Sequence, residues 1–279
     1  MLATLLLVFR EVLEAALIVS IVAAATRGVA GRGRWIGGGM ALGILGAVMV
    51  ALFASAIAET MSGMGQEWFN ACVLLAAVLM IGWHVVWMSR HGRELAMQMK
   101  SVGNEVTAGS RPLTALLVVV ALAVLREGSE VVLFGYGLLA GGSSAMSLAL
   151  GGILGLAIGV AVGFAMYFGL LKIPMQHFFS ATNGLLVLLA AGLASSAAGY
   201  LVQADALPPL VDMLWDSSWL LGNDSLLGHT LHVLIGYNAQ PSGIEMLFYA
   251  ATVILLVIGM RASRLPSPAP ATRAPQATH

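Results

Sequence analysis

Residues 10–14 are Arg10-Glu11-Val12-Leu13-Glu14, in the middle of an apolar run at residues 3–25. A second apolar run, at residues 113–138, contains Arg126-Glu127-Gly128-Ser129-Glu130. Charged side chains are costly in hydrocarbon, so an ionisable residue within a membrane helix marks a functional site by default. Two matching R-E-x-x-E motifs therefore predict a polar site at membrane depth.

The composition also indicates a membrane protein. The chain has 279 residues, of which 59% are hydrophobic and only 9% are charged, whereas ordinary soluble domains have about 25% charged residues. The 33 glycines are typical of closely packed membrane helices. The formal net charge of zero argues against a nucleic-acid-binding protein.

Seven windows have about the 20 mostly apolar residues that a membrane-spanning helix needs. They are residues 3–25, 36–58, 68–88, 113–138, 146–170, 180–201 and 245–260. The sequence thus predicts an all-α polytopic membrane protein with seven transmembrane helices. All Lys and Arg residues except Arg10 and Arg126 fall on one side of these helices. Because cytoplasmic loops collect Lys and Arg, we expect the N-terminus outside and the C-terminus in the cytoplasm.

The two motifs lie on spans that run in opposite directions, which is the pattern of an inverted 3+3 repeat. We expect repeat one at about 1–90 and repeat two at about 111–201, with a seventh helix at 245–260 outside the repeat. The outer segment 202–244 contains Leu226 to Ile235, predicted as a short amphipathic helix. The seven-helix domain would span 1–261, followed by a disordered cytoplasmic tail, residues 262–279, rich in Pro, Ala and Thr.

The spacing within each motif predicts how its side chains meet. Residues three apart share a helix face, so Glu11 and Glu14 project together, and each Arg stands four residues before the second Glu of its motif. Four carboxylates and two arginines carry about two negative charges in sum when all are ionised. Such a site suits hard metal ions. The alternatives are salt bridges that fix the helix bundle, or a proton relay in a carrier of organic solutes.

Other polar residues are weaker candidates. Glu59 and Glu67 flank the outer loop after span two and could receive an ion, or be solvated charges. Glu245 opens span seven, where a negative charge suits a helix N-terminus. His84, inside span three, is expected to be a packing histidine. The remaining candidates are the outer acidic residues, as a funnel or as solvated charges, and a histidine pair on one helix face: Asp205, Asp212, Asp216, Asp224, His229 and His232.

The motifs and their surroundings resemble the high-affinity iron permease family, also called the oxidase-dependent iron transporter family, in its bacterial Efe-type branch. The resemblance covers about residues 1–260. It rests on both motifs, on the stretch Ala15-Ala16-Leu17-Ile18-Val19 after the first, and on further short matches: Gly33-Arg34-Trp35-Ile36-Gly37, Glu59-Thr60, Gln66-Glu67-x-Phe69, Ala191-Gly192-Leu193-Ala194, Gly236-Tyr237, Pro241-Ser242 and Glu245. This sequence departs from the family pattern at Val12, Ser129 and Asn70, where Gly, Leu and often Glu are usual.

The resemblance implies an iron permease of the bacterial inner membrane and no enzyme. The expected substrate is iron, in the form of iron(III), with manganese or lead as alternatives, and no cofactor is implied. The motif glutamates, Glu11, Glu14, Glu127 and Glu130, would be the metal ligands, while Arg10 and Arg126 supply balancing charge. A bacterial family member would look to periplasmic partners such as a cupredoxin-like binding protein and a haem peroxidase.

Overall fold

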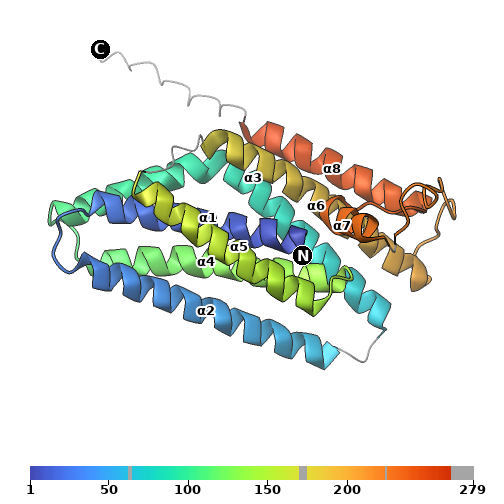
Figure 1. Ribbon diagram of the computed structural model, residues 1–279, viewed down its shortest axis with the longest axis horizontal. Coiled ribbons are helices and arrows are strands. Elements are labelled where there is room, and N and C mark those ends of the chain that lie inside the picture. The colour runs from blue at the N-terminus through green and yellow to red at the C-terminus, as the bar shows by residue number, and fades with distance from the viewer. Residues whose placement is uncertain (62–64, 170–174, 224, 265–279) are drawn as a thin grey trace, which may run out of the picture.

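The structure is a computed structural model, and it describes residues 1–61, 65–169, 175–223 and 225–264. Within these ranges every regular element is a helix. Most of the helices run roughly along the long axis of the molecule (Figure 1). In chain order they are α1 (Leu2–Ala25), α2 (Arg32–Met61), α3 (Gln66–Thr107), α4 (Thr114–Ala140), α5 (Ala145–Tyr167), α6 (Met175–Gln203), α7 (Leu226–Ile235) and α8 (Gly243–Arg264).

Each of the seven windows predicted as a span overlaps a helix, although the window 146–170 runs past the end of α5 at Tyr167. Five of these helices, α2, α3, α5, α6 and α8, contain stretches long and apolar enough to cross a membrane. The other two, α1 and α4, have 24 and 27 residues but carry the charged motifs. Their crossing therefore stays a prediction that depends on what surrounds the charges.

Three local predictions can be compared directly with the helices. The short helix predicted from Leu226 to Ile235 is confirmed as α7. The polar connector at residues 89–111, with its helix-forming stretch Glu94 to Lys100, predicts a separate surface helix between spans three and four. This prediction is wrong, because α3 continues without a break for 42 residues. That is about 63 Å at 1.5 Å per residue, roughly twice the hydrocarbon thickness. Helix α8 extends to Arg264, so residues 262–264 of the predicted tail are helical, and residues 265–279 lie outside the described part.

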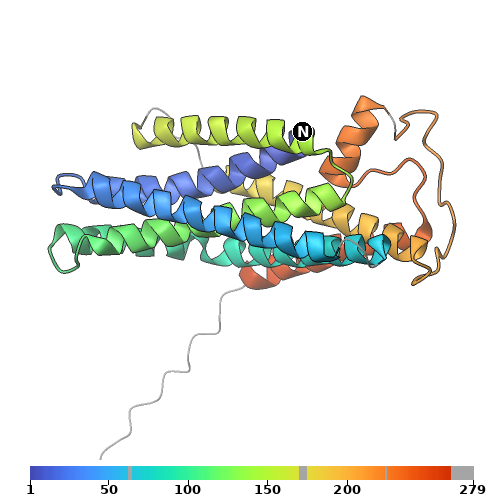
Figure 2. The same cartoon turned by 90° about the horizontal axis from the view of Figure 1, so that it is seen from below.

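The two motif helices are each paired with a glycine-rich helix from the other half of the chain. Helix α1 packs along α5, and α4 packs along α2, as the two views show (Figure 1, Figure 2). A Cβ added at Gly155 of α5 would lie 2.6 Å from the backbone oxygen of Leu5, and one at Gly43 of α2 would lie 2.8 Å from that of Ala121. Only glycine allows the backbones to approach this closely, which is how small residues drive helix association in membranes.

The remaining contacts place both motif helices at the centre. Helices α1 and α4 contact each other and both contact α3, which in turn packs against α6, and α8 covers α6 and α3. Two buried apolar clusters fill the bundle. One contains Leu7, Ile81 and Phe134, and the other contains Val22 and Val120. In sequence, both motifs fall between these clusters, so the charged layer is closed by apolar side chains toward each end of the bundle.

Candidate functional site

The first motif is buried. Arg10, Glu11 and Glu14 are 1%, 0% and 2% exposed, although all three are ionisable. The Arg10 guanidinium lies 2.7 Å from Glu11 Oε1 and 2.7 Å from Glu14 Oε1. The pairing predicted from the four-residue spacing is thus confirmed, and Arg10 also holds the adjacent glutamate. A guanidinium with two buried carboxylates is the compensation that a charge away from water requires.

The second motif repeats the pairing in a more open setting. Arg126 Nε lies 3.2 Å from Glu130 Oε1, as predicted, and 3.8 Å from Glu127 Oε1. Its side chain is 32% exposed, whereas Glu127 is buried. The guanidinium also sits over the Trp87 ring, 4.4 Å from the centroid, a cation–π contact. The two motifs have the same charges, but only the first has a fully enclosed arginine.

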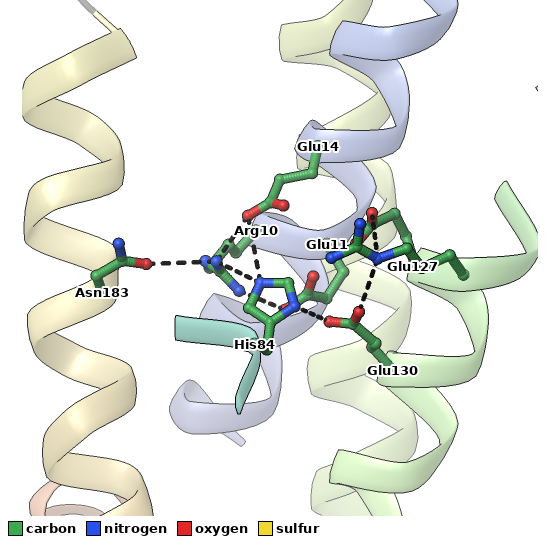
Figure 3. Close-up of polar contacts among 8 residues, drawn as sticks. Arg10, Glu11, Glu14, His84, Glu127, Glu130 and Asn183 are labelled. Carbon is green, nitrogen blue, oxygen red and sulfur yellow. Dashed lines mark hydrogen bonds and ion pairs between the residues drawn. The ribbon is translucent and has the colours of Figure 1, made fainter. Parts of the chain in front are cut away.

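His84 of α3 joins the two motifs, so the expectation of a packing histidine is wrong. Its Nε2 lies 2.7 Å from Arg10 Nη2 and 3.9 Å from Glu14 Oε1, while its Nδ1 contacts Glu130 Oε2. Figure 3 shows the ring between the carboxylates of α1 and α4. The signal that could have found it is the one used for the motifs: an ionisable residue in the middle of an apolar span.

Asn183 of α6 is a second residue that sequence reasoning missed. Its Oδ1 accepts a hydrogen bond of 3.4 Å from Arg10 Nη2, and the side chain is buried. A single polar amide in an apolar run carries little signal by itself. Its role becomes visible only because the fold brings α6 within reach of the first motif (Figure 3).

The carboxylates of both motifs converge closely enough to hold a metal ion together. Ligand atoms of Glu11, Glu127 and Glu130 lie within 4.8 Å of one another, and so do those of Glu11, Glu14 and His84. Among the described residues, the Oε2 atoms of Glu11, Glu14 and Glu127 are buried without a hydrogen bond or an ion pair. Buried polar atoms are otherwise nearly always satisfied. The surplus oxygens and negative charge make a cation the natural complement of this cluster.

A cavity of about 450 Å³ adjoins the cluster between α3 and α4. His84, Arg126 and Glu130 are its charged or polar lining, and the rest is apolar: Leu79, Met80, Trp83, Trp87 and Phe134. The side chains of the second motif therefore border open space, while those of the first are enclosed. The cavity between α3 and α4 therefore reaches the carboxylate cluster on the side of the second motif.

The two departures inside the motifs have separate structural consequences. Ser129 Oγ donates to the Leu125 carbonyl oxygen at 2.7 Å, the bond to the preceding turn that a serine within a helix commonly makes, and this directs the hydroxyl's proton away from the carboxylates. Val12 faces α5, where a Cβ at Gly159 would come within 2.8 Å of Val12 Cγ1. The valine is thus accommodated by a glycine on the partner helix.

Within the described part of the chain, the accessory candidates make no hydrogen bond or ion pair with the cluster. Glu67 is half-buried in the first turn of α3. Glu245 Oε2 accepts from the Ser242 backbone N at 2.8 Å, and Ser242 Oγ accepts from Glu245 N at 3.4 Å, a reciprocal cap of α8. The side chains of Glu59 and His229, and the whole of Asp224, lie outside the described part of the chain.

The outer segment's other candidates have local partners or none. Asp216 Oδ1 accepts from the backbone N of Ser218 at 2.9 Å, and Oδ2 accepts from Gln240 Nε2 at 2.9 Å. Hydrogen bonds from the Ser218 side chain and backbone hold the pKa of the Asp216 carboxyl below its usual range. His232 Nδ1 lies 2.8 Å from the Tyr237 carbonyl oxygen. Asp205 and Asp212 have no ion pair among the described residues.

Comparison with known proteins gives one consistent match. The model of the iron permease FTR1 family matches residues 1–265. The ferrous iron permease EfeU of Shigella sonnei (strain Ss046) and that of Escherichia coli O157:H7 are each 34% identical to this chain over 274 residues, covering 96% of both chains. The protein of the same name from Yersinia pestis is 30% identical over 259 residues, covering 91% of this chain and 90% of the relative. No solved structure matches significantly.

Proposed function

The chain belongs to the iron permease FTR1 family, and from that premise we propose that it imports iron across the bacterial cytoplasmic membrane through its two R-E-x-x-E motifs. It is a multi-pass membrane protein and a permease rather than an enzyme. Iron is its transported substrate. The helical architecture suits the inner membrane, because bacterial outer-membrane spans are strands of closed barrels.

One observation carries the assignment of the site. Carboxylate oxygens from both motifs, Glu11 of α1 with Glu127 and Glu130 of α4, lie within 4.8 Å of one another in the middle of the bundle. Salt bridges that merely fixed the helices would need no more carboxylates than bases, whereas here four carboxylates face two arginines and one histidine. The excess favours a cation site over a structural network.

The topology supports transport by alternating access. The cross-pairing of α1 with α5 and of α4 with α2 is the arrangement expected if two three-helix units of opposite orientation are interlocked. Apolar clusters lie on both sides of the charged layer, so passage of an ion requires the helices to rearrange. Rocking of one unit against the other would open each side in turn.

The distribution of basic residues supports the proposed orientation. Arg32 Nη1 donates to the Ala23 carbonyl oxygen at 2.6 Å, and Thr107 at the end of α3 donates to that of Ala25. These contacts gather the ends of α1 and α3 and the start of α2 at one end of the bundle, with Arg111 close by in sequence. By the positive-inside rule this end would face the cytoplasm, and the N-terminus, at the other end of α1, would then lie outside.

The family resemblance and the names of the curated relatives point to different oxidation states of the transported iron. The resemblance implied iron(III), delivered by an oxidising partner, whereas the curated relatives carry ferrous iron in their names. Carboxylates are hard ligands and suit either state. We take iron(II) as the substrate, and the periplasmic partners remain a prediction of the resemblance.

Radio-iron uptake into proteoliposomes tests this proposal. Glu11 contributes to both ligand sets, so Glu11→Gln is expected to abolish uptake while keeping nearly the same shape. Glu94→Gln, at an exposed position on α3, is the matched control and should transport like the wild type. Uptake by Glu11→Gln at the wild-type rate would refute the site. Equal competition by manganese or lead would instead redefine the metal.

A further inference from the structure

His84 lies outside the motifs, yet its side chain contacts carboxylates of both. Its Nδ1 meets Glu130 of α4, and its Nε2 lies 3.9 Å from Glu14 of α1. The ring is 3% exposed and meets Phe134 edge-on, with 6.5 Å between ring centroids. The imidazole is therefore held in place by its neighbours rather than free to rotate.

The partners of the ring fix the roles of its two nitrogens. Arg10 Nη2 lies 2.7 Å from His84 Nε2, and a guanidinium can only donate hydrogen bonds. Nε2 must therefore be the acceptor and carry the lone pair, which puts the proton of the neutral ring on Nδ1, facing the Glu130 carboxylate. Metal-binding histidines are typically held in this way, with one ring N–H on a carboxylate and the other nitrogen directed at the metal.

The Nε2 lone pair lies beside a compact ligand set, 3.9 Å from Glu14 Oε1. Ligand atoms of Glu11, Glu14 and His84 lie within 4.8 Å of one another, and all three residues are buried. Nitrogen and oxygen ligands lie about 2.0–2.2 Å from a first-row ion, so two ligands on opposite sides of it are roughly 4 Å apart. If the three ligand atoms moved toward one another by less than about 1 Å, they would be close enough to bind one ion together.

Arg10 now bridges these same three groups. Its guanidinium contacts Glu11, Glu14 and His84 at 2.7 Å each. A metal ion that binds them has to displace the guanidinium, exchanging one positive charge for two. Asn183 Oδ1, 3.4 Å from Nη2, is a partner that can retain the displaced group on the α6 side.

We propose that His84 Nε2 is a ligand of the transported ion, completing with Glu11 and Glu14 a mixed nitrogen–oxygen site that selects iron(II). Imidazole suits iron, whereas sites made only of carboxylate, carbonyl and water suit magnesium, calcium and manganese. The all-carboxylate set of Glu11, Glu127 and Glu130 cannot make this distinction by ligand type. The inference rests on the proposed function and names the ion preference of that same site.

Two substitutions separate a ligand from a structural histidine. His84→Gln puts an amide oxygen near the position of Nε2, so the Arg10 contact can persist while nitrogen is replaced by a harder atom. His84→Asn keeps an N–H near Nδ1 for Glu130 and removes the Nε2 lone pair. His91→Gln is the matched control, because His91 lies on the same helix and its ring stacks on Trp87, while its Nδ1 lies 3.1 Å from the Trp87 carbonyl oxygen rather than near a carboxylate of the motifs.

The readout is uptake of iron(II), kept reduced by ascorbate, and of manganese(II) by proteoliposomes. Loss of a group that merely orients a ligand already costs 10–100-fold, so in both His84 variants iron(II) uptake should fall by at least about tenfold. Manganese(II) uptake should fall less, and the iron-to-manganese ratio should drop. The control should keep the wild-type ratio. Equal loss of both metals would mean a structural role and overturn the proposal.

A second measurement remains decisive if a His84 variant fails to fold. X-ray absorption at the iron edge of the purified wild-type protein loaded with iron(II) should show the outer-shell scattering of a bound imidazole, and His91→Gln should retain it. Absence of that scattering in the wild type would overturn the proposal. If the wild type does not transport iron, or Glu11→Gln still does, the proposed function fails. If the wild type transports iron and Glu11→Gln does not, but the His84 variants keep the wild-type iron-to-manganese ratio, only the proposed role of His84 fails.

Discussion

Replacement of the two motif arginines by methionine should have very different costs, although the motifs have the same charges. Arg10 is 1% exposed and lies 2.7 Å from each of two buried carboxylates. Removing one partner of a buried ion pair costs about 3–5 kcal/mol, because the other charge is left uncompensated. The Arg126 side chain is 32% exposed, with contacts of 3.2 and 3.8 Å, and borders the cavity between α3 and α4. The prediction takes that cavity to hold water, in which such a pair contributes about 0–1 kcal/mol.

The expected difference in unfolding free energy between Arg10→Met and Arg126→Met is therefore about 3 kcal/mol. At roughly 2–4 °C per kcal/mol for a chain of this size, the Arg10 variant should unfold on the order of 10 °C earlier. Thermal unfolding of the detergent-solubilised protein, followed by the fluorescence of its six tryptophans, measures this shift. Glu14→Gln added to Arg10→Met should restore part of it. Equal midpoints for the two single variants would refute the burial argument.

Three further predictions concern packing and capping. Gly155→Ala places a methyl group 2.6 Å from a backbone oxygen of α1, about 0.8 Å inside ordinary contact, so the unfolding free energy should fall by about 1–3 kcal/mol. Gly152→Ala, with open space around it, is the control and should leave the unfolding free energy unchanged. An equal loss in both variants would contradict the tight α1–α5 contact. Ser129→Ala should leave uptake within about twofold of wild type, since its hydroxyl bonds a backbone oxygen; loss of uptake would give it a role in the site. Ser242→Ala should lower the unfolding free energy by about 0.5–2 kcal/mol through the lost cap of α8, with the iron concentration for half-maximal uptake unchanged.

Much of the local structure could be predicted because it depends on residues close in sequence. Apolar runs placed the helices, and α7 was predicted at its observed bounds. Four-residue spacing predicted both arginine–glutamate pairs. The length of α3 was missed because the polar stretch after residue 88 looked like a connector, although nothing in it stops a helix. The polar residues after residue 88 show where α3 leaves the apolar layer, but they do not show where the helix ends.

The candidate site was predicted only in part. The glutamates were identified because a charge in an apolar run is costly and needs a reason. His84 was assigned to packing because a lone histidine beside tryptophans shows no partner in the sequence. Its partners, Arg10 and Glu130, are 74 and 46 residues away in the chain. No periodicity connects such positions.

The sequence by itself determined two charged helices, each with its own arginine–glutamate pair, because these features follow from helical spacing and the cost of charge in hydrocarbon. The tertiary structure decided how the two motifs differ. Contact with α3 and α6 encloses Arg10, while the cavity between α3 and α4 leaves Arg126 partly open. It also placed an imidazole between the carboxylates of both motifs. Burial and ligand geometry depend on which helices pack together, and that follows from glycine contacts spread over the whole chain.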